Sequence, residues 1–152
     1  FPDRCVVSPL LPAMVKSGRL GQKSRQGFFK YAKKKKRGEF DPEFEEFLQP
    51  FVRKSEELTS EQIAARLFMP MLLEATRVIE EGLVRNVRDV DLGLIFGIGF
   101  PPFKGGLLFW ADTMAGSELL ETLKPFEQLG KRYQPTELLK EMVADERKFY
   151  ER

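Results

Sequence analysis

The fold is decided by residues 59–82, which read TSEQIAARLFMPMLLEATRVIEEG. Thr59 and Gln62 have the spacing of a capping box, in which each side chain bonds the other residue's backbone N–H at a helix start. Apolar residues then recur at helical spacing as far as Gly82, a residue type that ends helices. Pro70 lies inside this helix and is expected to kink it, because proline lacks a backbone donor. The predicted buried face comprises Ile63, Leu67, Met71, Ala75, Val78 and Ile79.

Further helices are predicted on both sides of this stretch. Ser8-Pro9, Asp41-Pro42 and Asn86 each place a capping side chain before an apolar pattern of helical spacing. Alternation of period two between turns, which is typical of a half-buried strand, occurs nowhere. The predicted fold class is therefore all-α. The remaining predicted helical segments are residues 107–114, residues 117–130 and a segment from Thr136 onward.

The composition excludes several kinds of chemistry. The 152 residues include no histidine and a single cysteine, Cys5. Ser-His-Asp and Cys-His catalysis are therefore excluded, as are an internal disulfide and a cysteine-built zinc site. The 25 basic and 23 acidic residues nearly cancel, so no domain-wide field attracts nucleic acid. No apolar run approaches the ~20 residues that span a bilayer, and we expect a soluble intracellular piece of a longer chain, opening at Phe1.

An unbroken basic run extends from Lys33 to Arg37. Like charges in such a block repel one another, which favours a solvated linker between two structural units. A nucleic-acid patch is the alternative interpretation. It is the less favoured one, because no pattern of a known nucleic-acid module surrounds the run.

The connection Gly97-Ile98-Gly99-Phe100-Pro101-Pro102 invites comparison with a dinucleotide-binding loop. Prolines stand where the third glycine belongs, and a predicted helix rather than a strand precedes it, so we interpret the connection as structural. Gly97 and Gly99 are expected to let the chain leave a helix sharply, and Gly105-Gly106 to allow close approach at the next helix start. Lys104 beside that start is a weak candidate for a phosphate contact. The residues of this structural motif are Gly97, Gly99, Phe100, Pro101, Pro102, Phe103, Gly105 and Gly106, with Phe100 and Phe103 expected to be buried on either side of the prolines.

Three glutamates are the remaining candidates for acid chemistry. Glu80 and Glu81 are sequence neighbours that point in different directions on a helix, and we interpret them as solvated charges. Glu74 lies among apolar residues and is expected to be partly buried and paired with a lysine or arginine. No catalytic, cofactor-binding or metal-binding residue is assigned in this chain.

Two stretches resemble one known family. Residues 18–24, GRLGQKS, and residues 27–31, GFFKY, resemble the ending of a 3-hydroxyacyl-CoA dehydrogenase helical domain. Residues 66–82, 89–97 and 99–106 resemble the second helical repeat of the multifunctional fatty-acid oxidation α-subunit type. The resemblance implies the helical fold of the 3-hydroxyacyl-CoA dehydrogenase C-terminal domain, which is similar to the C-terminal domain of 6-phosphogluconate dehydrogenase. It also implies a division into the tail of a first repeat (1–32), a basic linker (33–40) and a second repeat (41–152).

The resemblance implies a function for a parent protein rather than for this chain alone. In that family an enoyl-CoA hydratase domain comes first, a Rossmann domain that binds NAD follows, and two helical repeats close the chain. The catalytic histidine and its glutamate partner belong upstream, and the position of an active-site asparagine is occupied here by Ala65. The expected role is therefore structural and docking, with the fragment alone inactive and holding no cofactor. The expected partners are the upstream dehydrogenase and hydratase domains, with acyl-CoA as the substrate of the parent and a thiolase subunit as a further candidate.

Two alternatives stay open, and the compartment depends on the source. The chain is expected to be cytoplasmic if it is bacterial, with an organelle as the other possibility. An independent acyl-CoA or protein binding module would use the aromatic loop and the basic run. A nucleic-acid binder would use Lys33 to Arg37 and would show a steep salt dependence of its affinity.

Overall fold

The structure is a computed structural model that describes residues 3–5, 7–33, 37–52 and 57–150. It contains helices and isolated bridges but no strand among these residues, so the all-α prediction is confirmed. The contacts divide the chain into two compact units. Unit 1 comprises Phe1–Arg4 and Leu58–Arg152, and unit 2 comprises Cys5–Glu57.

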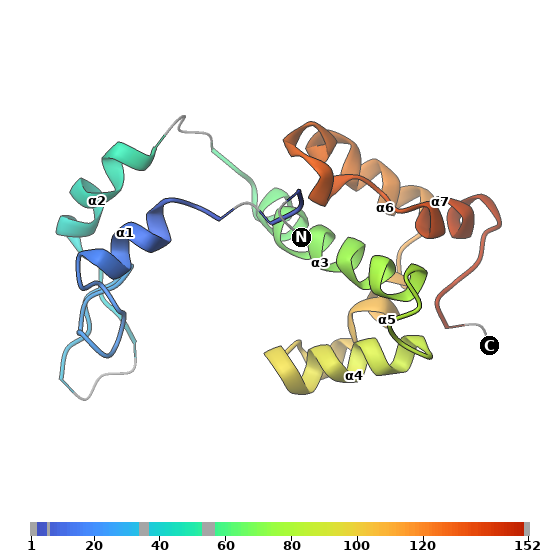
Figure 1. The fold of residues 1–152 in the computed structure, drawn as a ribbon, viewed down its shortest axis with the longest axis horizontal. Helices are drawn as coiled ribbons and strands as arrows, with labels where there is room; N and C mark the ends of the chain where they lie inside the picture. Colours follow the sequence, from blue (N-terminus) through green and yellow to red (C-terminus); the bar gives the residue numbers. More distant parts are fainter. Residues whose placement is uncertain (1–2, 6, 34–36, 53–56, 151–152) are drawn as a thin grey trace. The chain divides into compact units, whose positions relative to one another are not determined.

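Unit 1 is built on one long helix, α3 (Ser60–Glu80), against which the later helices pack. Figure 1 shows α3 in green with α6 and α7, in orange and red, beside it. None of the helices in the described part of the chain has the length and apolar character needed to span a bilayer. The other elements of unit 1 are α4 (Val87–Ile98), η2 (Pro102–Lys104), α5 (Leu107–Ala111), α6 (Gly116–Leu123), η3 (Lys124–Leu129), η4 (Lys131–Tyr133) and α7 (Glu137–Ala144).

Unit 2 contains two short helices joined by an irregular loop. The helices are α1 (Leu10–Lys16) and α2 (Pro42–Leu48), and the 3₁₀ turn η1 (Gln49–Phe51) follows α2. Isolated antiparallel bridges pair Gly21 with Gln26, Gln26 with Lys30, and Lys30 with Glu39. The loop is therefore ordered by hydrogen bonds of its own rather than by a sheet.

The starts of α2, α3 and α4 lie where the sequence places them, whereas α1 begins at Leu10 after Pro9, one residue later than a Ser8 cap predicts. The capping box of α3 is confirmed, with the Gln62 N–H donating to Thr59 Oγ1 at 3.2 Å and the Thr59 N–H donating to Gln62 Oε1 at 3.0 Å. Asp41 and Asn86 likewise accept from the first turns of α2 and α4. Capping is local in sequence, which is why it can be predicted without the tertiary structure.

The buried face of α3 differs from the predicted one. Ile63 and Leu67 are exposed, at 46% and 62%, whereas Met69, Leu72 and Leu73 are buried. Residues four apart advance by about 40° around a helix of 3.6 residues per turn. The predicted series therefore changes face along α3: it is exposed at Ile63 and Leu67 and reaches the core at Ala75, which is 5% exposed.

Polar side chains on α3 hold the segment that leads into α7. Arg77 donates to the carbonyl oxygens of Lys131 and Gln134, both at 3.0 Å, and pairs with Glu74 at 2.8 Å. The buried hydroxyls of Thr76 and Thr136 lie 3.0 Å apart. The predicted pairing of Glu74 with a basic residue is confirmed. Its partner, Arg77, is the residue that holds the segment before α7.

The compact units divide the chain at a different place from the predicted linker. The division falls between Glu57 and Leu58, whereas the predicted linker covers residues 33–40. The reason is that Glu39 pairs with Lys30 and Asp41 with Arg19, so contacts cross the basic run. The assignment of 41–57 to a second repeat stays a prediction, and Lys34 to Lys36 lie outside the described residues.

Candidate functional site

The glycine–proline connection lies between α4 and α5. Gly99 ends α4 in the left-handed conformation with φ 74°, as its place before Pro101-Pro102 predicts. Its N–H and that of Phe100 bond carbonyls of the last turn, namely Ile95 O at 3.2 Å and Leu94 O at 3.1 Å. Gly97 does not help the chain leave the helix, because α4 continues through Ile98.

The two phenylalanines of the connection have different environments. Phe100 is 5% exposed and meets Phe68 edge to face, with ring centroids 6.0 Å apart. Phe103 is 84% exposed, so the prediction that both would be buried was wrong. Phe103 lies in the 3₁₀ turn η2, which turns its ring away from the α3 core while Phe100 enters it.

Asp91 is the buried polar centre of this connection. Its carboxylate comes from α4 and accepts from the backbone N–H groups of Leu108 at 2.8 Å and Phe109 at 3.1 Å. It also accepts from the Tyr150 hydroxyl at 2.8 Å. The N-cap of α5, Gly106, has no side chain to cap the helix, so Asp91 provides the cap from a neighbouring helix.

Position 106 requires glycine because the Asp91 carboxylate occupies the space that a Cβ would take. A Cβ built on Gly106 would lie 2.2 Å from Asp91 Cγ, and the residue has φ 125°. Gly105, with φ 81°, has the Phe109 ring in the corresponding place at 2.5 Å. The close approach expected of Gly105-Gly106 therefore exists, and its purpose is to admit Asp91 and Phe109.

A second carboxylate holds the C-terminal segment. Asp112 follows α5 and accepts from the N–H groups of Phe149 at 2.9 Å and Tyr150 at 2.8 Å. Tyr150 thus contacts both aspartates, and burial together with its hydrogen bond to Asp91 raises the pKa of its hydroxyl. The tyrosine remains protonated and acts as a donor.

Sequence reasoning missed these two aspartates. One signal was available for Asp91, because it lies four residues after Val87 and three before Leu94, on the inward face of an apolar helix. A carboxylate on such a face needs buried donors. No comparable signal marks Asp112, whose partners lie 37 and 38 residues away.

The connection does not fit a dinucleotide phosphate. A phosphate binds where free N–H groups converge at a helix start. Here the N–H groups of Leu108 and Phe109 already donate to the Asp91 carboxylate, which would also repel an anion. The same observation argues against Lys104 as a phosphate contact.

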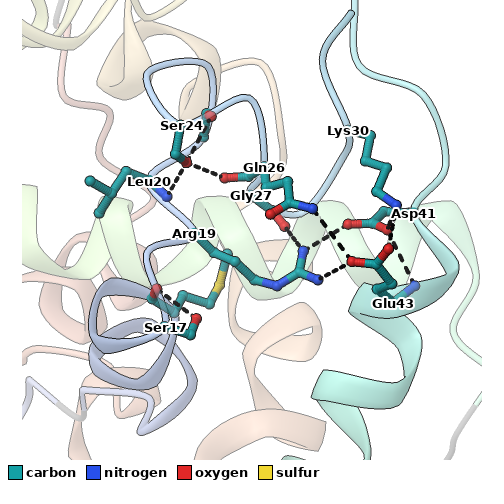
Figure 2. Close-up of polar contacts among 11 residues, drawn as sticks. Ser17, Arg19, Leu20, Ser24, Gln26, Gly27, Lys30, Asp41 and Glu43 are labelled. Atoms are coloured by element: carbon teal, nitrogen blue, oxygen red, sulfur yellow. Dashed lines mark hydrogen bonds and ion pairs between the residues drawn. The ribbon is translucent and has the colours of Figure 1, made fainter.

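Arg19, the arginine of GRLGQK, is the centre of a charged cluster in unit 2. Figure 2 shows its guanidinium reaching the Gly27 carbonyl at 3.1 Å and Asp41 Oδ2 at 2.7 Å. Lys30 approaches the other oxygen of Asp41 at 3.3 Å and bonds Glu43 at 2.7 Å. The cluster joins the irregular loop to the first turn of α2.

Aromatic rings complete the environment of Arg19. Its guanidinium carbon lies 5.7 Å from the Phe44 ring centroid and 5.5 Å from that of Phe47. The hydrogen bond from Arg19 lowers the pKa of Asp41, and the bond to Glu43 raises the pKa of Lys30. Both shifts favour the charged forms, so the cluster is a fixed ionic clamp rather than a proton-transfer site.

The other predicted carboxylates have structural partners as well. Glu80 accepts from the Leu138 N–H at 2.9 Å, and Glu81 lies 3.8 Å from Arg4. Both glutamates are exposed, as the interpretation as solvated charges predicts, and each also has a partner within unit 1. Among the described residues, no three histidine, cysteine, aspartate or glutamate side chains gather as metal ligands.

These features define an all-α fold in which the carboxylates of Asp41, Asp91 and Asp112 hold helices and loops together. Residues 63–150 match the family described as 3-hydroxyacyl-CoA dehydrogenase, C-terminal domain. The chain belongs to the 3-hydroxyacyl-CoA dehydrogenase C-terminal-domain family.

Curated relatives match over almost the whole chain. Proteins named fatty acid oxidation complex subunit alpha from Pseudomonas paraeruginosa and Pseudomonas aeruginosa are 38% identical over 99% of the chain. The protein of the same name from Pseudomonas syringae is 37% identical over 99% of it. The chain spans 22% of the length of these relatives.

Proposed function

We propose that this chain is a structural and docking part of a bifunctional fatty-acid β-oxidation enzyme. The parent would hydrate an enoyl-CoA and oxidise the resulting 3-hydroxyacyl-CoA by hydride transfer to NAD. The observation that carries the proposal is the likeness to fatty acid oxidation α subunits along 99% of the chain. The match of residues 63–150 to a 3-hydroxyacyl-CoA dehydrogenase domain supports it independently.

The arrangement of polar groups supports a structural role. Asp91 and Asp112 accept backbone and tyrosine hydrogen bonds within unit 1, and Asp41 is neutralised by Arg19 and Lys30 in unit 2. A general base needs a free lone pair within reach of a substrate proton. These carboxylates direct their lone pairs toward donors of the protein itself.

Ala65 also supports a structural role for this chain. It occupies the position that resembles the asparagine of the family motif, and its methyl group packs against the core of unit 1. A methyl group cannot bond a substrate oxygen. With no histidine in the sequence, the reaction would depend on residues of the upstream domains.

The proposed partners follow from the proposed parent. They are the dehydrogenase and hydratase domains of the same polypeptide, with NAD bound by the dehydrogenase part and acyl-CoA as the substrate. A thiolase subunit is the further partner proposed. The cytoplasm is the proposed compartment for a bacterial source.

Two measurements test the proposal against its alternative. A longer polypeptide that includes this chain and the upstream domains should reduce NAD with a 3-hydroxyacyl-CoA, and deletion of residues 58–152 should abolish that activity. The 152-residue chain should bind acyl-CoA weakly, if at all, in calorimetric titration. Micromolar binding, about 8 kcal/mol, would instead favour an independent acyl-CoA binding module.

A further inference from the structure

Basic charge is concentrated in one part of the sequence. Residues 5–38 contain ten of the chain's 25 basic residues and none of its 23 acidic residues, so the rest of the chain has 15 basic against 23 acidic residues. The small net charge of the whole chain therefore conceals a strongly basic segment and an acidic remainder. A segment of this kind attracts an anionic partner.

The basic segment leads into a short antiparallel ribbon, by which we mean residues 29–31 and 38–40. Lys30 and Glu39 exchange both backbone hydrogen bonds, Lys30 N to Glu39 O at 3.0 Å and Glu39 N to Lys30 O at 2.8 Å. Side chains alternate between the two faces of such a pairing. Lys30 points to the ionic clamp, where its ammonium lies 3.3 Å from Asp41 (Figure 2). The residues on either side of the bonded pair therefore face away from the clamp.

The face of the ribbon turned away from the clamp is aromatic. It carries Phe29, Tyr31 and Phe40, which we call the aromatic face, and the two phenylalanines are 50% and 66% exposed. A Cβ on Gly38 would overlap Phe29 and lie 3.1 Å from the Tyr31 ring. Gly38 therefore opens to the same face and leaves room for both rings.

Cations border the aromatic face. Lys33 follows Tyr31 by two residues, and its side chain is exposed. Arg37, directly before Gly38, is exposed as well. Arg25 is also exposed, and its carbonyl accepts from the Tyr31 N–H at 2.9 Å, which brings a third cation to the ribbon. Exposed rings and exposed cations are thus gathered on one loop of unit 2.

We propose that the aromatic face and its bordering cations bind the anionic surface of a phospholipid bilayer. Each lysine or arginine near an anionic leaflet contributes about a factor of five in affinity. Aromatic rings lie at the level of the lipid headgroups, where one side of the ring is apolar and the other is wet. A bilayer therefore uses both the charge and the exposed apolar area of this surface. The inference is independent of the proposed enzyme function.

A bilayer fits these residues better than a nucleic acid does. Single-stranded nucleic acid binds where successive bases stack along a positively charged groove that follows the backbone. Phe29 and Phe40 lie opposite each other across a narrow ribbon, beside the cations rather than in a row between them. Within the described part of unit 2, the exposed phenylalanines therefore do not form a stacking platform for several bases.

Co-sedimentation with vesicles tests the proposal on the 152-residue chain and on the longer polypeptide. Both should bind vesicles of phosphatidylglycerol and phosphatidylcholine at least tenfold more tightly than vesicles of phosphatidylcholine alone. Raising the salt from about 0.1 M to about 0.5 M should weaken the binding, because screening shortens the reach of the charges. Equal binding to the two kinds of vesicle would overturn the proposal. So would binding by the 152-residue chain alone, because another part of the longer polypeptide would then cover the surface.

A matched pair of double variants tests where the charge acts. Lys33→Gln combined with Arg37→Gln should weaken binding to phosphatidylglycerol vesicles at least tenfold. Lys124→Gln combined with Lys140→Gln makes the same change in net charge on exposed residues of unit 1, and should leave the binding nearly unchanged. Equal losses for the two double variants would mean that net charge alone drives the binding, and the proposed surface would be wrong.

Tryptophan fluorescence reports whether the aromatic face enters the bilayer. The chain has one tryptophan, Trp110, which provides the baseline. Phe40→Trp should move the emission to shorter wavelength when phosphatidylglycerol vesicles are added, because the new ring leaves water. Phe103→Trp, at an exposed phenylalanine of unit 1, should not. The absence of a shift for Phe40→Trp would overturn the proposal, and an equal shift with a DNA oligonucleotide would identify a nucleic acid as the partner instead.

Discussion

Asp91 shows how one carboxylate can define a helix start from a distance. It satisfies two N–H groups at the beginning of α5 and one tyrosine hydroxyl, and it does so from α4. Three partners supply the donors that a buried carboxylate requires. Gly106 completes the arrangement by leaving space for the carboxylate where any other residue would place a Cβ.

The first prediction compares the partners of Asp91. Asp91→Ala should lower the free energy of unfolding by about 2–4 kcal/mol, because it leaves buried N–H groups without acceptors. Tyr150→Phe removes one hydrogen bond and should cost about 1 kcal/mol. Chemical denaturation of both variants gives the comparison. A smaller effect for Asp91→Ala than for Tyr150→Phe would show that Asp91 is not the centre of the connection.

The second prediction ranks three glycines near the same connection. Gly106→Ala should cost about 3 kcal/mol, because positive φ and the overlap with Asp91 act together. Gly99→Ala, which has φ 74° but nothing within 4 Å, should cost about 1 kcal/mol. Gly97→Ala is the control, since it lies inside α4 with open space and should stabilise by up to about 1 kcal/mol. Denaturation midpoints measure the stability of the three variants, and any order other than Gly97→Ala above Gly99→Ala above Gly106→Ala would contradict the prediction.

At the scale of elements, the ionic clamp of unit 2 takes the place of a hydrophobic core. Arg19 connects the irregular loop to the N-cap of α2, and its guanidinium lies within 6 Å of two aromatic ring centroids. The short helices of unit 2 have few buried side chains, of which Met14 is one. Charged contacts with partners on several segments therefore determine how the loop and α2 fit together.

The third prediction concerns the pH dependence of that clamp. The folded pKa of Asp41 lies below its ordinary value of about 3.9, so the clamp stabilises unit 2 above this pH and loses its effect as the pH falls through the folded pKa. Asp41→Asn should lower the unfolding temperature at neutral pH and make the loss of stability in acid smaller. Glu45→Gln, an exposed carboxylate of the same helix, should do neither. Thermal unfolding followed by circular dichroism from about pH 2 to 7 measures both effects. If the unfolding temperature of Asp41→Asn and of the parent chain changed with pH in the same way, the ion pairs of Asp41 would not stabilise unit 2.

The elements also show which features a single sequence can predict. The caps at Thr59, Asp41 and Asn86 were predictable because donor and acceptor lie within three residues. The face that α3 buries was not, because apolar residues surround much of the helix and the neighbouring helices select among them. The contact of Asp91 with Leu108 spans 17 residues and depends on the turn between two helices.

For the whole molecule, the family match to residues 63–150 falls within unit 1. Unit 1 has a complete helical core, in which α7 is covered by α3 and α6. In unit 2, Leu11 and Val15 of α1 are exposed, at 49% and 64%.

The fourth prediction is that the 152-residue chain will not oxidise 3-hydroxyacyl-CoA with NAD. It has no histidine to remove the hydroxyl proton, and the glycine connection that resembles a nucleotide loop is closed by Asp91. Ala65→Asn restores the amide of the family motif but neither the base nor the cofactor site, so it should remain inactive as well. NADH absorbance measured on clean protein tests both forms, with the longer polypeptide as the positive control. Turnover by the 152-residue chain would show that a base other than histidine operates within it, and turnover gained only with Ala65→Asn would place that base near α3.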